Sequence, residues 1–199
     1  RKELDEVLTI PFLGNIPRHG NKKGEDSDGI VVRENGRDSV SEAFRIIRTN
    51  MDFMRVKAAN LQVVMFTSAN PGAGKTFVSS NLAMSIAQTN KKVVLVDVDI
   101  RKGTLSGIFS NSSNRMGLTH YLSGSTDKVD DIVGTSEEYE KLDVIFSGPV
   151  PPNPAELLLS ERFDRLIAEL RKRYDYIIVD NVPAGMVADG PSRPNGLRK

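Results

Sequence analysis

The chain has 199 residues, which is enough for one α/β domain with a sizeable core but not comfortably enough for two. The formal net charge of +1 gives no strong basic field, so composition does not indicate nucleic acid as a partner. The absence of cysteine excludes disulfides, thiolate metal sites and a cysteine nucleophile, and it is compatible with a reducing cytosol.

No apolar run reaches the roughly 18 residues that are needed to cross a bilayer. No signal peptide is visible. The chain begins at Arg1 rather than at a methionine, which suggests a piece of a longer protein.

Residues 1–38 are predicted to form an N-terminal segment and a flexible loop outside the main domain. The apolar stretch Val7–Ile16 is interrupted by Pro11 and Gly14. The following stretch, His19–Gly29, contains Gly, Lys and Asp but no apolar residue, so we expect it to be solvated and mobile.

The first clear helix is predicted to begin near Ser39. Ser39 and Glu42 have the spacing of a capping box, in which a hydroxyl and a carboxylate each accept a free backbone N–H. Apolar residues then recur at spacings of four and three, which places them on one face of the helix for burial. They are Val40, Phe44, Ile47, Met51 and Met54.

Short apolar runs alternate with helix-forming segments through the rest of the domain. The runs predicted to be buried strands are Val63–Phe66, Val93–Val96, Leu142–Phe146 and Tyr176–Val179. The predicted helices are Thr76–Ala87, one that begins at Pro154 after the N-cap Asn153, and one from Ser160 that carries Phe163, Leu166, Ile167 and Leu170 on one face. This order predicts a mostly parallel sheet with helices on both faces, a three-layer α/β/α fold over residues 39–189. Residues 190–199 are predicted to be a disordered tail.

The segment Ala69–Thr76 matches the phosphate-binding P-loop pattern, with alanine in place of the first glycine. Its glycines allow several backbone N–H groups to converge on one phosphate, and the helix that follows adds the positive end of its dipole. Lys75 is expected to reach the β- and γ-phosphates of ATP, and the Thr76 hydroxyl to ligate Mg²⁺. A strand–turn–helix connection that uses glycine only for its geometry is the alternative. The predicted nucleotide-binding residues in and after the loop are Gly72, Ala73, Gly74, Lys75, Thr76 and Phe77.

Three aspartates follow predicted strands that flank this loop. Asp97 and Asp99 follow one buried strand and Asp180 follows another. Because ligands of open parallel sheets bind beyond the carboxyl ends of the strands, all three are expected to point towards the P-loop and to support Mg²⁺. Any one of them alone could simply end a strand, as Asp often does in turns. Arg101 could contact a phosphate or pair with Asp99.

With these residues in place, the chain resembles the bacterial tyrosine kinases, in the MinD/ParA-like branch of P-loop ATPases. The resemblance spans about Leu4 to Asp189. Its motifs are Walker A at Ala69–Thr76, the more discriminating Walker A′ at Val94–Arg101, Walker B at Ile177–Asp180, the Glu42-x-x-Arg45-x-x-Arg48 motif, and the segment Ser147–Leu158.

The resemblance implies autophosphorylation on tyrosine with Mg-ATP as the donor. It implies that Lys75, Asp97 and Asp99 are catalytic, with Asp97 activating the attacking tyrosine hydroxyl. Thr76, Asp97, Asp99 and Asp180 would serve the metal, and Arg101 the nucleotide.

The resemblance also implies partners and a location. Glu42, Arg45 and Arg48 would form the contacts of a ring-shaped homo-oligomer, although on spacing alone Glu42 and Arg45 are a solvated ion pair. The other implied partners are the membrane-spanning region of the parent chain or an adaptor, and an opposing tyrosine phosphatase. The parent protein would lie at the cytoplasmic face of the bacterial inner membrane and regulate capsular or exopolysaccharide synthesis.

The sequence departs from the family after Walker B. The family usually continues Asp-Thr/Ser-Pro-Pro, whereas this chain has Asp180-Asn181-Val182-Pro183, and its four tyrosines form no C-terminal cluster. We therefore expect a fold truncated after the Walker B strand, an edge of the sheet that is exposed or covered by a partner, and weak or absent self-phosphorylation.

Two other functions are compatible with the motifs. One is a MinD/ParA-like ATPase switch, which is disfavoured because that class carries an extra lysine early in its P-loop and Ser68–Gly72 contains none. The other is a nucleotide-binding scaffold that lacks an acceptor tail.

Overall fold

A five-stranded sheet in the order β1-β5-β2-β4-β3 lies at the centre of the computed structural model. The structure describes residues 11–18, 29–57, 61–68, 70–100, 103–109, 116–135 and 140–181. The strands are β1 (Val63–Phe66), β2 (Val93–Asp97), β3 (Gly134–Thr135), β4 (Leu142–Ile145) and β5 (Tyr176–Asp180). All pairs are parallel except β3 with β4. The four predicted strands and the mostly parallel sheet are confirmed.

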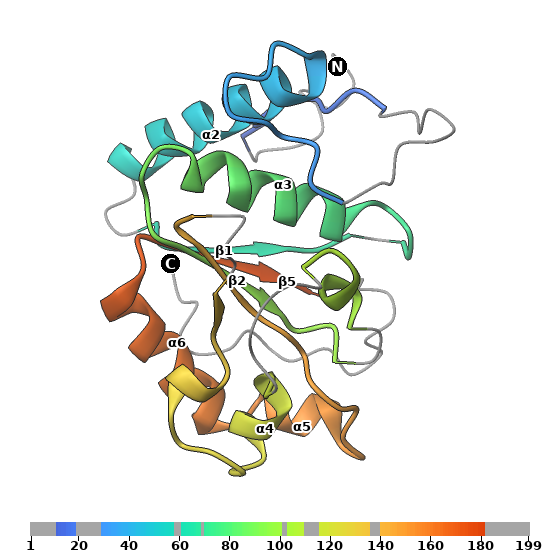
Figure 1. Cartoon of the computed structure of the whole chain (residues 1–199), viewed down its shortest axis with the longest axis vertical. Coiled ribbons are helices and arrows are strands. Elements are labelled where there is room, and N and C mark those ends of the chain that lie inside the picture. Colours follow the sequence, from blue (N-terminus) through green and yellow to red (C-terminus); the bar gives the residue numbers. More distant parts are fainter. Residues whose placement is uncertain are drawn as a thin grey trace.

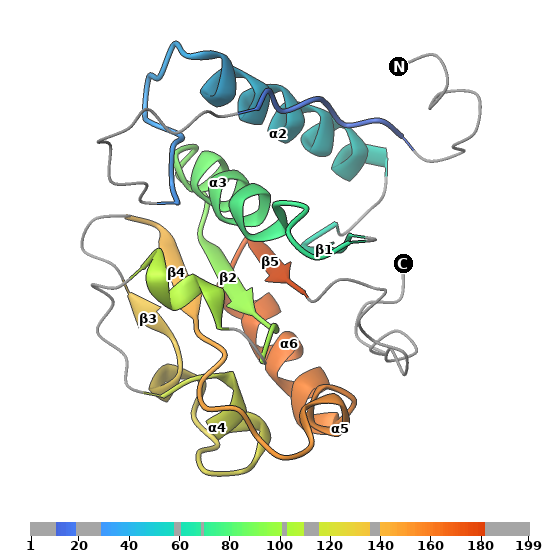
Figure 2. The same ribbon diagram turned by 90° about the vertical axis from the view of Figure 1, so that its right-hand side faces the viewer.

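Helices cover both faces of the sheet, as Figures 1 and 2 show. Helices α2 (Ser39–Lys57) and α3 (Lys75–Ala87) lie on one face. Helices α4 (Leu118–Leu122), α5 (Pro154–Leu158) and α6 (Glu161–Arg173) lie on the other. Two short 3₁₀ turns, Thr104–Gly107 and Val129–Asp131, complete the described elements. The three-layer α/β/α fold follows from this arrangement.

The helices on each face of the sheet pack against it and form a separate hydrophobic core. The apolar stripe of α2 is buried at Val40, Phe44, Ile47 and Met51, as its spacing predicts. On the other face, α6 buries the four residues that its period predicts: Phe163, Leu166, Ile167 and Leu170. Strands β2 and β5 are buried along their whole length because they lie between the two cores.

The start of α2 differs from the predicted capping box. The Asp38 carboxylate, through Oδ1, accepts the N–H groups of Val40 and Ser41, and its Oδ2 accepts the Ser41 hydroxyl. These bonds, that of the Ser41 hydroxyl first, lower the pKa of Asp38. Glu42 pairs with Arg45 instead. Asp38 takes the capping role because it is the residue before the first helical turn and has the stronger, charged acceptor.

Residues before α2 pack against the helical layer. The buried Asn81 side chain of α3 accepts the N–H groups of Val31 and Val32 and donates to the Gly29 carbonyl oxygen. Val32 is itself part of the core. Residues 29–32 are therefore held against the domain, whereas residues 19–28 lie outside the described part of the chain.

Strand β1 differs from the other parallel strands in its surroundings. Within the described residues it pairs only with β5, and its four side chains are half-buried, not buried on both faces as the apolar run predicts. Among the described strands, the one that leads into the P-loop thus lies at an edge of the sheet. In the described part of the chain, no helix has the length and apolar character of a membrane span.

Candidate nucleotide-binding site

The P-loop connects β1 to α3 in a conformation that depends on its glycines. Gly72 has φ 73° and Gly74 has φ 84°, in the left-handed region that side chains rarely adopt. A Cβ atom at either position would meet nothing within 4 Å, so the backbone conformation and not space requires glycine there. No side chain caps α3 at Gly74. The first N–H groups of α3 have no acceptor within the helix, so they are available to an anion.

Two side chains from the start of α3 face the polar ends of the strands. The Lys75 ammonium donates to the Ser68 hydroxyl at 3.2 Å, which keeps its charge beside the loop. The Thr76 hydroxyl donates to Asp180 Oδ2 at 2.6 Å, across 104 positions of sequence. The predicted meeting of the P-loop with the end of the Walker B strand is therefore present in the structure.

Asp97 and Asp180 lie side by side because β2 and β5 are parallel and in register at these residues. Asp97 is fully buried and accepts the N–H groups of Asp99 at 3.0 Å and Leu105 at 3.4 Å. Burial raises the pKa of Asp97 to about 7, and the neighbouring Asp180 charge adds to the rise against the lowering effect of the Leu105 bond. A carboxyl group that titrates near neutrality can exchange a proton at physiological pH.

One carboxylate oxygen of Asp180 is a candidate partner for a hydrated metal ion. Its Oδ1 is buried and has no hydrogen-bond partner, although Oδ2 is satisfied by Thr76. Burial raises the pKa of Asp180, while the Thr76 bond and the nearby Lys75 charge act in the opposite direction. An unsatisfied buried carboxylate oxygen next to a hydroxyl fits a hydrated Mg²⁺ ion, which prefers oxygen ligands and keeps several waters.

The described residues contain no group of three or more His, Cys, Asp or Glu side chains arranged to hold a metal directly. Asp97, Asp99 and Asp180 therefore do not form an all-protein cage. Mg²⁺ in this site would need water and phosphate oxygens, together with the Thr76 hydroxyl, which agrees with its preference for few direct protein ligands.

The remaining predicted nucleotide residues fall into two groups. Ala69 and Arg101 lie outside the described residues. The Phe77 ring is partly buried and packs against the core, with its centroid 6.1 Å from that of the Phe44 ring of α2. Only the backbone N–H of Phe77 is therefore placed to serve a phosphate.

Thr104 is a site residue that the sequence did not single out. Its hydroxyl lies 3.2 Å from the Thr76 hydroxyl, at the start of the turn after β2. No motif marks it, and only the return of the chain after Asp99 brings it to the P-loop.

The predicted interface residues lie along α2, away from the P-loop. Glu42 and Arg45 form an exposed ion pair, and Arg45 also donates to the Gly36 carbonyl oxygen. The Arg48 guanidinium donates to the carbonyl oxygen of Ser85, and its Nη1 lies 3.3 Å from the Ser85 hydroxyl. Arg48 thus ties α2 to α3 within the chain.

Comparisons with known proteins show which family the chain resembles. A family model described as an AAA domain matches residues 61–189. The chain is 42% identical over 192 residues to a putative tyrosine-protein kinase in the cps region of Klebsiella pneumoniae, covering 94% of this chain and 26% of that protein.

Solved structures with related sequences superpose on this chain. The chimerical protein CapA2B2 superposes with a TM-score of 0.80 at 35% identity, over 94% of this chain and 76% of that one. The kinase domain of the Escherichia coli tyrosine kinase ETK gives 0.73 at 35% identity, over 95% and 68% of the two chains.

The chain belongs to the AAA domain family of P-loop nucleotide-binding proteins, in the branch of the bacterial tyrosine kinases. It spans about a quarter of the length of the Klebsiella relative.

Proposed function

We propose that this chain is the Mg-ATP-dependent kinase module of a bacterial tyrosine kinase that regulates capsular or exopolysaccharide synthesis, chain length and export. The observation that carries the proposal is the hydrogen bond from Thr76 to Asp180, beside the buried Asp97. It joins the P-loop to the two acidic strand ends, so phosphate binding and proton acceptance share one place.

The residues divide the work of phosphoryl transfer in the proposed reaction. The N–H groups from Gly72 to Thr76 and the Lys75 ammonium bind the phosphates, and Lys75 offsets the charge on the β- and γ-phosphates. Thr76, Asp180 and Asp99 would hold Mg²⁺, and the bound ion would offset negative charge on the phosphates. Asp97 accepts the proton of the attacking tyrosine hydroxyl. The tyrosine oxygen forms a bond to the γ-phosphorus, and the bond from that phosphorus to ADP breaks.

The products distinguish this function from its alternatives. Incubation of the protein with Mg-ATP and a tyrosine-containing acceptor, followed by mass spectrometry and assays for ADP and free phosphate, is the test. Equal amounts of ADP and phosphotyrosine support the kinase. ADP with free phosphate alone would make the chain an ATPase switch, and binding without turnover would make it a scaffold.

We also propose that the exposed face of α2 forms a contact between copies of this chain. Besides the Glu42–Arg45 pair, this face carries Ile46, 49% exposed, and Phe53, 66% exposed. Residues 42, 46, 49 and 53 recur at helical spacing, so apolar and charged groups share one stripe. Exposed large apolar side chains in such a stripe are typical of a protein interface.

Light scattering after size exclusion tests the α2 contact. Phe53→Ser and Arg45→Glu should each reduce the mass of the oligomer, because they remove an apolar anchor and reverse a charge. Arg165→Glu on the exposed surface of α6 is the matched control and should leave the mass unchanged. A wild-type protein that stays monomeric at concentrations near 100 μM with Mg-nucleotide would contradict the contact.

The larger setting is proposed from the family resemblance. The parent protein would lie at the cytoplasmic face of the bacterial inner membrane. Its partners would be its own membrane-spanning region or an adaptor, and a tyrosine phosphatase that reverses the reaction.

A further inference from the structure

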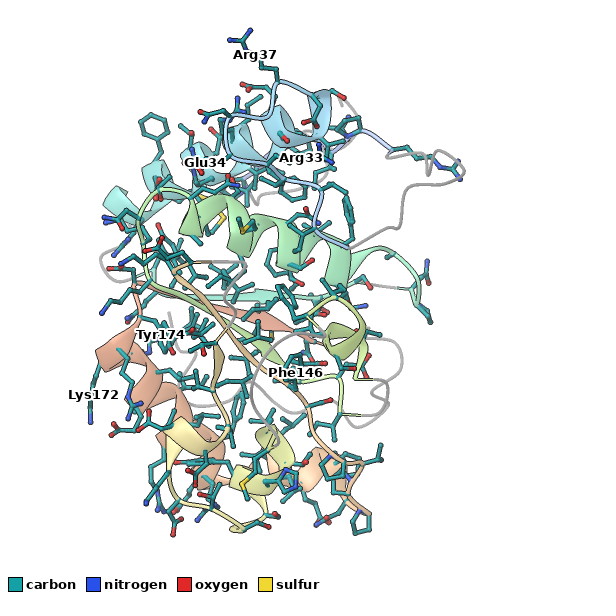
Figure 3. All side chains as sticks on the ribbon, viewed as in Figure 1. Arg33, Glu34, Arg37, Phe146, Lys172 and Tyr174 are labelled. Carbon is teal, nitrogen blue, oxygen red and sulfur yellow. The ribbon has the colours of Figure 1, made fainter. Side chains whose placement is uncertain are left out.

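A basic pocket lies at the end of the sheet opposite the P-loop. It has a volume of about 580 Å³ and is lined by residues from α2, α6 and the segments that lead into β1, β2, β4 and β5. In Figure 3, Lys172 and Tyr174 of this region lie towards the opposite end of the strands from Phe146, which follows β4 at its carboxyl end. The cationic side chains that line the pocket are Arg55, Lys92, Lys141, Arg171, Lys172 and Arg173.

Strand register brings these charges together. Val93 of β2 pairs with Leu142 of β4 and with Tyr176 of β5, so the residues just before the three strands are neighbours. Two of these neighbours are Lys92 and Lys141, and the third is Asp175. The last turn of α6 then adds three consecutive basic residues beside them.

The acidic groups near the pocket offset only part of this charge. Asp175 is the one carboxylate among the lining residues, and its Oδ2 accepts the backbone N–H of Lys92. Lys172 pairs with Glu169 of the same helix, and Arg173 pairs with Asp130 of the 3₁₀ turn Val129–Asp131. Within the described residues, no ion pair involves the Lys92 or Lys141 side chain.

The walls of the pocket are fixed by hydrogen bonds. The Gln62 amide donates to the carbonyl oxygens of Arg171 at 2.8 Å and Tyr174 at 2.6 Å, which ties the segment before β1 to the end of α6. The Tyr174 hydroxyl donates to Asp143 at 2.7 Å. The Arg55 guanidinium lies 4.9 Å from the centre of the Tyr176 ring. The backbone of the pocket is therefore held in place, while cationic side chains that it carries, such as Lys92 and Lys141, are exposed to solvent.

Lys141, which lines the pocket, has an unusual backbone conformation. Its φ of 68° is in the left-handed region, where a lysine is uncommon and costs free energy. Asn90, which also lines the pocket, has φ 60°. A lysine at a position that suits glycine indicates that its side chain has a role which glycine could not fill.

We propose that this pocket binds a small, multiply charged phosphate-bearing ligand, at a site separate from the P-loop. Guanidinium and ammonium groups are the usual protein partners of phosphate, and arginine can bind it through two parallel hydrogen bonds. The volume suits a compact ligand, within the usual range of roughly 300–1,000 Å³ for small-molecule sites. The strands that separate the two sites span about 15 Å, so both can be occupied together.

Inorganic tripolyphosphate without added metal is the probe, measured by isothermal titration calorimetry in the Lys75→Met background to silence the P-loop. Lys92→Gln combined with Lys141→Gly should weaken binding by at least tenfold. Glycine adopts the left-handed backbone conformation at position 141 without strain, so this substitution removes the charge and does not destabilise the backbone. Lys91→Gln is the matched control, since Lys91 is an exposed neighbour that does not line the pocket, and it should change the affinity less than twofold.

Equal affinity in the double variant and in the Lys91→Gln control would overturn the proposal, as would an absence of binding at millimolar probe and low salt. Sedimentation with phosphatidic acid vesicles identifies the source of the phosphate. Vesicle binding that is lost in the double variant assigns the site to a lipid headgroup. Probe binding without vesicle binding assigns it to a soluble phosphate ester.

Discussion

The chemistry of Asp97 follows from where its strand ends. The side chain is buried between two cores, next to Asp180 on the adjacent strand, and the two backbone N–H groups that it accepts do not compensate fully for the lost water. The pKa is therefore raised to about 7, which suits the proposed role of Asp97 as a proton acceptor near neutral pH.

The raised pKa predicts how stability depends on pH in the metal-free protein. Between the unfolded value of 3.8 and the folded value of about 7, the folded state binds the proton of Asp97 more tightly than the unfolded state does. The free energy of unfolding should therefore fall as pH rises through this range, by up to about 1.4 kcal/mol per unit from this one group. Urea denaturation in EDTA at several pH values measures it.

Asp97→Asn is the comparison, because the amide does not titrate while Asp180 remains in both proteins. The slope of stability against pH should become shallower in the variant. Identical slopes in the two proteins would show that Asp97 is ionised in the folded state throughout this range.

The described tyrosines are poorly placed as phosphate acceptors. Tyr176 is buried and its hydroxyl donates to Asp52, and Tyr174 donates to Asp143. Burial, followed by the bond to Asp143, raises the pKa of Tyr174. Tyr121 is 5% exposed under the Arg162 guanidinium. Tyr139 lies outside the described residues.

After incubation of the folded protein with Mg-ATP, peptide mass spectrometry should therefore find little phosphate on residues 121, 174 and 176. Phosphate on a large fraction of any of these three would mean that the chain opens locally during the reaction. The predicted weakness of self-phosphorylation would then have lost its structural support.

At the scale of elements, the beginning of α2 depends on Asp38. Asp38→Ala should lower the free energy of unfolding by about 1 kcal/mol, as the loss of a helix cap commonly does. Ser39→Ala is the control and should cost less than about 0.5 kcal/mol, since surface substitutions away from special features usually stay within that limit. Urea denaturation compares the two. A larger loss for Ser39→Ala would restore the capping box that the sequence suggested.

The elements that the sequence predicts well are those whose local pattern and packing agree. The four strands of the parallel sheet are short, mostly apolar runs, and α6 buries the face that its period indicates. By contrast, α4 has five residues and β3 has two, too few for a period to be read. The start of α4 is fixed from a distance, by hydrogen bonds from Leu118 and Thr119 to the carbonyl oxygens of Phe146 and Ser147.

The same distinction applies to the site. Lys75, Thr76 and the acidic strand ends could be found because each belongs to a local motif, and parallel strands bring them to one edge. Thr104 and the unpaired Asp180 Oδ1 could not, because both depend on contacts between segments far apart in the sequence. The basic pocket was missed for that reason as well, since it results from strand register and not from a run of residues.

At the scale of the whole molecule, the sheet separates two polar ends. The carboxyl ends of β2 and β5 carry Asp97 and Asp180 beside the P-loop, and the amino ends of the same strands lead from the basic pocket. Helix α2 lies on the outside of one helical layer (Figure 2), and its residues 42, 46, 49 and 53 are exposed. A nucleotide, a second anion and another copy of the chain would therefore each have a different face.

Binding of Mg-nucleotide measures the central feature directly. With Mg-ADP at 100 times its dissociation constant, the folded state should gain about 2.7 kcal/mol, seen as a rise in melting temperature of several degrees. In Lys75→Met the rise should be lost, while the melting temperature without nucleotide stays close to that of the wild type. A wild-type protein that gives neither calorimetric heat nor a melting shift with Mg-ATP or Mg-ADP would contradict the site and the kinase function that rests on it.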